Sequence, residues 1–349
     1  MTHAPLVELP AALSTQQPRS DARYVMGVDG GATKTLAAVL DLRERTLQLG
    51  HGGPSNQDAV GAEAAVRELL KAADEAISRT GIDAKQLGAA VLAVAGTDTE
   101  DLAGNVRAAR TEAWLVINDV VAAWATATGG GPGVAAIAGT GSNVFGVGGA
   151  GKETRAWRAG GWGHLLGDEG SGYWLGVQSI KAALRHRECS GPATALSDAL
   201  PAFFGEASVE AVAARVYSKP LTKGEIAAFA IETAKLAERG DAVARGLYEW
   251  GARELGEQIA AVIHQTGLCG DDAAQEFPVG LIGSAFKAGR VFIQPLTEVI
   301  HACAPGAHVG TVEMAPVGGS LLLAARMCGE GDAIALAELA ALIERALRG

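Results

Sequence analysis

The chain has 349 residues with a formal net charge of −10, and 48% of its residues are hydrophobic. This length and apolar content suit two domains with separate cores, and a charged fraction of 19% excludes general disorder. The acidic balance, with no Lys/Arg tract to offset it, disfavours non-specific binding of nucleic acid. Four cysteines lie far apart with no CxxC pair, a pattern that fits reduced thiols in the cytoplasm.

The start of the chain and its apolar runs bear on targeting. Residues 1–23 contain three prolines and no basic stretch followed by an apolar one, so they predict a flexible lead-in rather than a secretion signal. Glycine or charge breaks every apolar run before it reaches the length of a membrane span. We therefore expect a cytoplasmic protein with no membrane partner.

Strands and helices alternate in the first half of the chain. An apolar run, Tyr24–Asp29, leads through a glycine turn to a second run over 35–42, which predicts a β-hairpin. Residues 58–78 have helical periodicity, and the runs 89–95 and 114–117 predict buried strands. This alternation indicates an α/β fold.

A similar strand–glycine turn–strand unit returns at residues 134–147, which indicates a duplicated domain. The later predicted elements are helices near 173–187, 223–238 and 241–265, a strand near 279–282, a helix from 290, a strand near 309–313, a helix from 319 and an amphipathic helix over 332–347. We predict an N-terminal domain over 24–128, completed by a C-terminal helix at 331–348. A larger C-terminal domain is predicted over 129–330.

A glycine-rich turn follows the first strand of each half. Glycines let backbone amides converge on an anion, and neighbouring hydroxyl and ammonium groups add donors. Each turn alone could be an ordinary hairpin turn, but a matched pair favours phosphate binding. The candidate phosphate-binding residues are Gly30, Gly31, Thr33, Lys34 and Thr35 in the first turn and Gly139, Thr140, Gly141 and Ser142 in the second.

Carboxylates stand at the ends of two predicted strands. Asp29 ends the first strand, where it could hold Mg²⁺ directly or through water. Asn118 and Asp119 end another, a common position for catalytic groups in α/β proteins. Asp119 could accept the proton of a hydroxyl that attacks a γ-phosphate. Either residue could instead cap the helix expected over 120–128, and one could cap while the other catalyses.

The most distinctive stretch is GGWGHLLGDEGSGYW at 160–174. Glycine backbone, carboxylates and aromatic rings together suit a sugar site, although Trp162 and Trp174 could be core residues. Two shorter turns are further candidates. Asn56 could bind a sugar hydroxyl or cap the following helix. The backbone of segment 283–289 could contact an adenine ring, or the segment could be an ordinary strand-to-helix turn.

Taken in order, these motifs resemble the N-acetylglucosamine kinase branch of the BadF/BadG/BcrA/BcrD ATPase family, in the sugar kinase/Hsp70/actin superfamily. The resemblance extends from Tyr24 to Ala325, and GGWGHLLGDEGSGYW is its most specific part. It implies a two-domain actin-like, ribonuclease H-like ATPase fold with a nucleotide and sugar cleft between the domains. It also implies Asp119 as the base, sugar contacts at Asn56, Asn118, Asp119, Gly161, Trp162, Gly163 and Asp168, and adenosine contacts at Gly283, Ser284 and Lys287.

The reaction implied by this resemblance is transfer of phosphate from ATP, with Mg²⁺, to the C6 hydroxyl of an amino sugar. N-acetylglucosamine is the expected substrate. Glucosamine and N-acetylmuramic acid are alternatives, because these sugars differ at C2 or C3 and the residues that contact those positions are not identifiable from the sequence. From another class, a dehydratase activator ATPase would need cysteines for a shared iron–sulfur cluster, and none lies in a glycine-rich loop. The family includes homodimers, and no feature of the sequence decides the oligomeric state.

Overall fold

The computed structural model describes residues 22–97, 102–110, 112, 114–149, 154–218, 221–269, 275–330 and 334–348. Residues 1–21 of the predicted lead-in lie outside this range. The chain forms two compact units. Unit 1 comprises the described residues of Met1–Ala135, Ala150–Ala156 and Val312–Gly349, and unit 2 comprises those of Ala136–Gly149 and Trp157–Thr311. Within the described residues, no helix is long and apolar enough to span a membrane.

The sheet of unit 1 has five strands in the order β3-β2-β1-β4-β5. Their bounds are β1 Tyr24–Gly30, β2 Thr35–Asp41, β3 Thr46–Gly52, β4 Leu87–Val94 and β5 Leu115–Asn118. Strand β1 pairs antiparallel with β2 and parallel with β4, which confirms the predicted hairpin. Every residue of β2 is buried, as expected for a strand covered on both faces.

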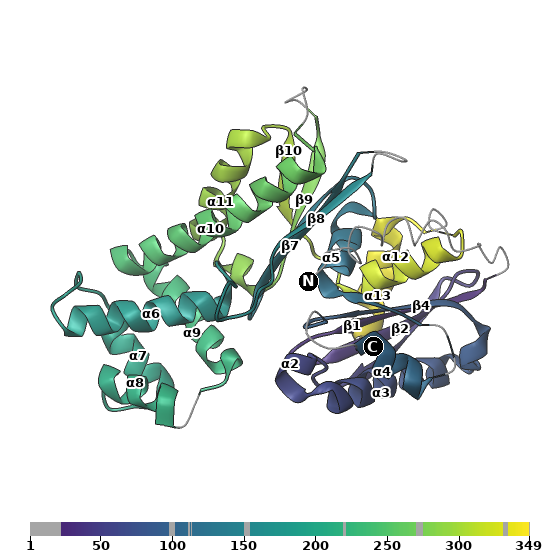
Figure 1. Ribbon diagram of the computed structural model, residues 1–349, viewed down its shortest axis with the longest axis horizontal. Coiled ribbons are helices and arrows are strands. Elements are labelled where there is room, and N and C mark those ends of the chain that lie inside the picture. The colour runs from purple at the N-terminus through teal and green to yellow at the C-terminus, as the bar shows by residue number, and fades with distance from the viewer. Residues whose placement is uncertain are drawn as a thin grey trace. The chain divides into compact units, whose positions relative to one another are not determined.

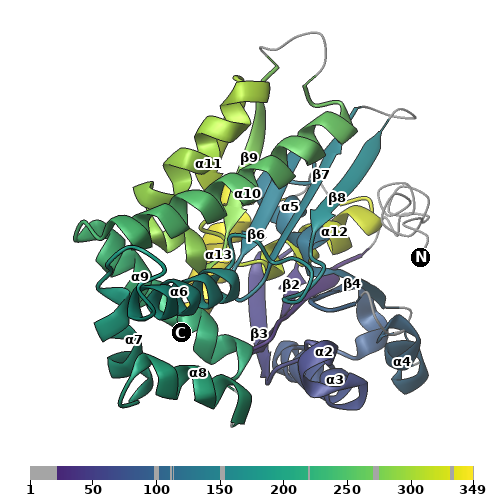
Figure 2. The same ribbon diagram turned by 60° about the vertical axis from the view of Figure 1, so that its left-hand side comes forward.

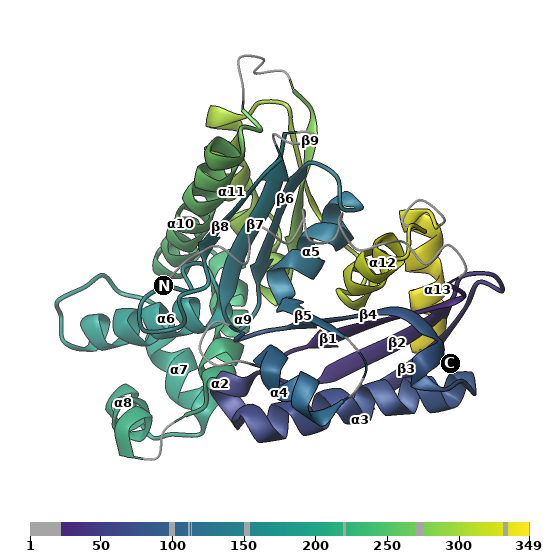
Figure 3. The same ribbon diagram turned by 45° about the vertical axis from the view of Figure 1, so that its right-hand side comes forward.

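Helices cover both faces of this sheet, as Figures 1 and 3 show. Helices α3 (Ala62–Thr80) and α4 (Leu102–Ala109) lie on one face, after the short α2 (Gln57–Val60). Helices α5 (Asp119–Thr128) and α12 (Val317–Met327) lie on the other, and α13 (Leu336–Arg348) contacts β3. A Cβ on Gly27 of β1 would lie 2.6 Å from the Leu321 nitrogen, so glycine allows α12 to approach the strand closely.

The second sheet has the order β10-β9-β6-β7-β8. Its strands are β6 Gly133–Ala138, β7 Ser142–Gly148, β8 Arg155–Gly160, β9 Phe277–Ile282 and β10 Ala307–Thr311. Helices α10 (Ala242–Thr266) and α11 (Arg290–Cys303) lie side by side, and α10 packs on β7 (Figure 2). A 3₁₀ helix, η3 (Ser284–Ala288), connects β9 to α11.

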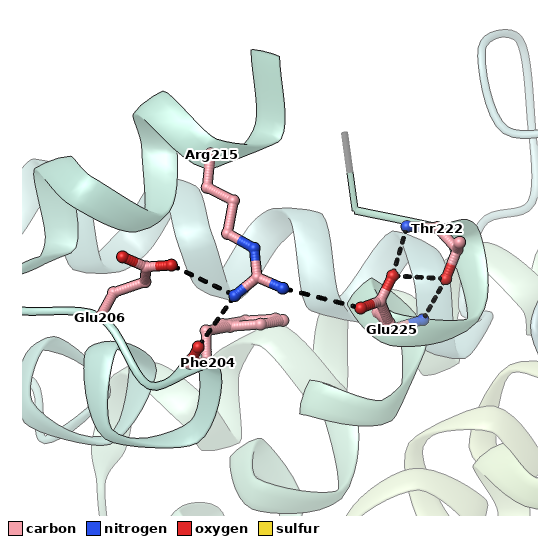
Figure 4. A network of polar contacts seen from close by, with 5 residues as sticks. All are labelled: Phe204, Glu206, Arg215, Thr222 and Glu225. Atoms are coloured by element: carbon pink, nitrogen blue, oxygen red, sulfur yellow. Dashed lines mark hydrogen bonds and ion pairs between the residues drawn. The ribbon is translucent and has the colours of Figure 1, made fainter. Parts of the chain in front are cut away.

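Four helices form a second core within unit 2: α6 (Gly172–Arg187), α7 (Leu196–Phe204), α8 (Val209–Ser218) and α9 (Lys223–Glu238). Figure 4 shows how Arg215 of α8 joins its neighbours. Its guanidinium donates to the Phe204 carbonyl oxygen at 3.0 Å and lies 3.2 Å from a Glu206 carboxylate oxygen and 3.8 Å from one of Glu225. Glu225 also completes the capping box of α9 with Thr222, so this network connects α7, α8 and α9.

Candidate active site

The predicted phosphate turn of unit 1 is a tight connection between β1 and β2. The Gly31 amide donates to the Lys34 carbonyl oxygen at 3.0 Å, and the Ser55 amide donates to the Gly31 carbonyl oxygen at 3.0 Å. A Cβ on Gly30 would lie 2.5 Å from the Ser55 hydroxyl oxygen. Glycine at this position therefore lets the segment around Ser55 pack against the turn.

Side chains in this turn have different surroundings. The Thr35 hydroxyl lies 2.7 Å from the Gly53 carbonyl oxygen and 2.8 Å from the Ser55 hydroxyl, and Thr35 is only 1% exposed. Thr33 and Lys34 are exposed. Thr35 therefore holds the turn in place, whereas Thr33 and Lys34 are accessible to a ligand. The sequence does not reveal the contact between Ser55 and Thr35, because the two residues are 20 positions apart in the chain.

Asn56 lies beside the same turn. Its amide donates to the Gly31 carbonyl oxygen at 3.2 Å, immediately after the Ser55 amide bonds the same oxygen. Asn56 is half-buried. The fold of unit 1 thus brings the predicted sugar contact next to the predicted phosphate turn.

Two carboxylates come together near this turn. Asp29 is at the end of β1, and Asp119 is the first residue of α5, directly after β5. Burial, followed by the charge of Asp119, raises the pKa of the Asp29 carboxyl to about 7, and the Lys34 ammonium opposes the rise. An electrostatic effect of this kind requires the three groups to be near one another. A pair of neighbouring carboxylates is stabilised by a cation, so oxygen donors here suit Mg²⁺.

The donor set also indicates how Mg²⁺ would be held. Among the described residues, no group of three or more His, Cys, Asp or Glu side chains could by itself hold a metal ion. Mg²⁺ commonly binds through one or two carboxylates together with phosphate oxygens and water. Asp29 therefore fits as the protein ligand of a Mg²⁺ ion whose other ligands would be phosphate oxygens and water.

Asn118 is the N-cap of α5. Its Oδ1 accepts a hydrogen bond from the Val120 amide at 3.2 Å, and its Nδ2 donates to the Thr97 hydroxyl at 3.1 Å. The residue is 6% exposed. The cap thus belongs to Asn118, which orients the first turn of α5. Asp119, half-buried in that turn, carries the carboxylate next to Asp29.

The second predicted phosphate turn connects β6 to β7 in unit 2. The Gly139 amide donates to the Gly141 carbonyl oxygen at 2.9 Å. The amides of Gly172 and Tyr173, at the start of α6, donate to the carbonyl oxygens of Gly139 and Thr140 at 2.8 and 3.2 Å. The turn is therefore held by the first turn of α6, and Thr140 is half-buried.

Ser142 connects this turn to the glycine loop, by which we mean residues 160–171. The Ser142 amide donates to Asp168 Oδ1 at 3.1 Å, and its hydroxyl donates to the Glu169 carbonyl oxygen at 2.8 Å. The Gly161 amide donates to the Ser142 carbonyl oxygen at 3.1 Å. A Cβ on Gly141 would lie 2.8 Å from Asp168 Oδ1, so a glycine is needed there for Asp168 to approach.

Asp168 has an unusual environment. It is 8% exposed and has a positive φ of 64°, which few residues other than glycine adopt. Burial, assisted by the Glu169 charge, raises the pKa of the Asp168 carboxyl, while the Ser142 amide and the charges of Lys223 and His164 oppose the rise. Desolvation lowers the pKa of His164, which favours its neutral form.

The two tryptophans of the distinctive stretch differ in their surroundings. Trp162 is 56% exposed, and the Arg158 guanidinium carbon lies 5.8 Å from its ring centroid. Trp174 packs edge-on against Trp250, with ring centroids 4.6 Å apart. Trp162, between Gly161 and Gly163 (φ 72° and 78°), can therefore present its ring to a ligand, whereas Trp174 packs within the fold.

The predicted adenosine segment begins at a position that only glycine can occupy. Gly283 has φ 125°, and a Cβ there would collide with the Ala138 carbonyl oxygen, next to the Gly139 turn. Gly283, Ser284 and Lys287 are exposed. The fold therefore places this segment beside the second phosphate turn. A hollow of about 750 Å³ begins nearby at Gly289 and follows α11, but none of the predicted site residues lines it.

The chain matches the BadF/BadG/BcrA/BcrD ATPase family over residues 26–324. It belongs to this family. It is 33% identical over 246 residues to an N-acetylmuramic acid/N-acetylglucosamine kinase from Clostridium acetobutylicum, covering 69% of this chain and 79% of the relative. It is 29% identical over 318 residues to an N-acetyl-D-glucosamine kinase from Dictyostelium discoideum, covering 86% of this chain and 97% of the relative.

Solved structures share the fold. A candidate N-acetylglucosamine kinase from Chromobacterium violaceum matches with a TM-score of 0.67 at 24% identity, covering 86% of this chain and 99% of that one. A ROK family glucokinase from Streptomyces griseus, in complex with glucose and AMPPNP, matches with a TM-score of 0.50 at 20% identity, covering 93% and 100%. The family match and the two relatives confirm the predicted family resemblance, and the solved structures confirm the α/β, two-domain actin-like ATPase fold. Membership of an ATPase family implies use of ATP.

Proposed function

We propose that the protein is an ATP-dependent kinase that phosphorylates the C6 hydroxyl of an amino sugar, with N-acetylglucosamine as the acceptor. The observation that carries the proposal is the position of Asp29 and Asp119 at the same edge of the sheet, beside the exposed Lys34 turn, since Gly30 and Asn118 both pair with Val94 of β4. The chain also belongs to an ATPase family. The two curated relatives support the substrate class, because both are named as kinases of N-acetylated amino sugars.

Asp119 is the proposed general base. It lies in the first turn of α5, at the end of β5. In this role it accepts the proton of the C6 hydroxyl as that oxygen attacks the γ-phosphate. Asn118 keeps it there by capping the helix. Asp29, together with phosphate oxygens, would hold Mg²⁺, whose positive charge would offset the charge of the phosphates.

The remaining site residues bind and orient the substrates. Thr33, Lys34 and the Gly30–Gly31 backbone bind phosphate in unit 1, with Thr35 holding the turn. The Gly139–Ser142 turn of unit 2, including Thr140, binds phosphate through its amides and hydroxyls, and Gly283, Ser284 and Lys287 contact adenosine. Asp168 and Asn56 accept or donate hydrogen bonds to sugar hydroxyls, and Trp162 between its two glycines packs on the sugar ring.

A coupled ADP-release assay tests this function. N-acetylglucosamine, glucosamine, N-acetylmuramic acid and glucose are compared at equal concentration, and we expect N-acetylglucosamine to give the highest kcat/KM. Asp119→Asn is expected to lower kcat by at least about 10²-fold while ATP affinity stays within about threefold, because it removes a base and no phosphate contact. Asp198→Asn, at an exposed aspartate of α7, is the control and should leave kcat unchanged. ATP hydrolysis that no sugar accelerates would refute the assignment.

A further inference from the structure

Gln258, in the middle of α10, contacts the glycine loop at both of its ends. Its Nε2 donates to Glu169 Oε2 at 2.9 Å, near the end of the loop. Its Oε1 lies against Gly160, where the loop begins, so closely that a Cβ on that glycine would collide with it. Gly160 has φ 73°, a conformation that glycine adopts without strain. One side chain thus bridges the loop's two ends from the helix behind it.

The contact with Glu169 acts on the residue next to Asp168. The Asp168 backbone is in the left-handed region, at φ 64°, which is unfavourable for a residue with a Cβ. Such a conformation persists where neighbouring contacts hold it. Ser142 supplies contacts on one side, through the Asp168 carboxylate and the Glu169 carbonyl oxygen. The hydrogen bond from Gln258 fixes the Glu169 side chain, and because the acceptor is charged it is stronger than a neutral one.

The other end of the Gln258 amide argues against a purely stabilising role. Its Oε1 is buried, and it has no hydrogen-bond partner within the part of the chain that the structure describes. Burial of an unpaired acceptor is unfavourable, and an apolar residue of similar size would avoid it. The amide therefore fits a role in which its hydrogen bond to Glu169 and its contact with Gly160 set the geometry of the loop.

We propose that Gln258 is a positioning residue for the amino sugar: it holds the glycine loop so that Asp168 and the Gly161–Gly163 backbone face the bound sugar. This inference rests on the proposed function for its substrate, but the contacts that it invokes do not. Gln258 is not among the proposed sugar or phosphate contacts, so its proposed effect is transmitted through Glu169 and Gly160.

Hydrogen exchange of the free protein measures loop geometry without any assumption about activity. In Gln258→Ala, the amides of residues 160–171 are expected to exchange at least about tenfold faster, because loss of a charge-assisted bond favours local opening. Glu169→Ala should give a similar increase, and the double variant should add little to either single one. Glu169→Gln keeps an acceptor oxygen for Gln258 Nε2 and should stay within about threefold of the wild type. Gln265→Ala, at an exposed position of the same helix, is the control.

Steady-state kinetics then connect the loop to the sugar. Gln258→Ala should raise KM for N-acetylglucosamine about tenfold while KM for ATP stays within about twofold, a split that general loss of stability would not produce. Exchange within twofold of the wild type in both Gln258→Ala and Glu169→Ala would overturn the proposal. So would faster exchange with an unchanged KM for the sugar. A wild-type protein that phosphorylates no amino sugar would instead refute the proposed function, and the exchange data would still decide whether Gln258 holds the loop.

Discussion

Replacement of Asp29 by Asn should stabilise the nucleotide-free protein while it abolishes kinase activity. Burial and the charge of Asp119 raise the pKa of Asp29 from 3.8 to about 7. Between about pH 4 and 7, the folded protein therefore binds a proton that the unfolded chain has released, and this carboxyl makes the free energy of unfolding fall as pH rises. Above pH 7 the ionised group has its full destabilising effect, which Asp29→Asn removes.

The size of the effect follows from the shift. A rise of about three pKa units corresponds to about 4 kcal/mol at most. Asp29 is only partly buried, so water screens part of this energy and we expect about 2 kcal/mol at pH 8. For a unit of this size that is a rise in Tm of about 4–8 °C. At pH 4 the two proteins should differ by less than about 0.5 kcal/mol, since Asp29 is then largely protonated in the folded state.

Thermal and urea unfolding of the two proteins from pH 4 to 8, without nucleotide or divalent cation, measure this difference. Asp119→Asn should show a smaller stabilisation in the same direction, because it removes only the part of the shift that its charge contributes. An Asp29→Asn protein with the wild-type Tm at pH 8, or with a stabilisation independent of pH, would refute the reasoning that these carboxylates are close and desolvated.

Two further sets of variants test the geometry of unit 2. Gly141→Ala should lower Tm, because its Cβ would lie 2.8 Å from Asp168 Oδ1. Gly139→Ala, whose Cβ meets nothing within 4 Å, should keep the wild-type Tm and raise KM for ATP. Equal melting temperatures for the two variants would contradict this geometry. Arg215→Met should lower the free energy of unfolding by about 1–2 kcal/mol with kcat unchanged, because it removes the donors to Phe204 and Glu206. Arg187→Met, which removes an exposed ion pair, is its control in urea unfolding and should change stability by less than about 0.5 kcal/mol.

Elements with strong local signals were predicted well from the sequence. The helices α9 and α10, predicted from their apolar periodicity, begin within a residue of the predicted positions. In the structure they follow N-caps at Thr222 and Asp241. The β1–β2 hairpin follows from two apolar runs around a glycine turn.

Other elements carry no such signal and were not predicted. In strand β8 only Ala156 is buried and there is no apolar run, and α7 contains Pro201, which normally marks the end of a helix. The helix predicted from residue 319 is present as α12, at 317–327, but its packing on β1 and α5 was not predicted. The contact between α12 and β1 depends on Gly27 and joins residues that are almost 300 positions apart in the sequence, so local patterns do not reveal it.

The candidate site shows the same limit. Local residues could not decide between cap and catalyst at 118–119, because Asn and Asp suit both roles; the hydrogen bond from the Val120 amide assigns the cap to Asn118. Gln258 was not recognised at all, because a glutamine inside a long helix is normally a surface residue. Its contacts with Glu169 and Gly160 exist only through packing of α10 behind the loop.

The most direct test of the proposed kinase activity is a product balance. The protein is incubated with ATP, Mg²⁺ and N-acetylglucosamine, and ADP, inorganic phosphate and phosphorylated sugar are quantified together by ³¹P NMR. Phosphotransfer to C6 predicts one 6-phosphosugar for each ADP, with little inorganic phosphate, and loss of both products in Asp119→Asn. Inorganic phosphate equal to ADP, with no phosphosugar, would contradict the account and show that the protein is an ATPase without a sugar acceptor.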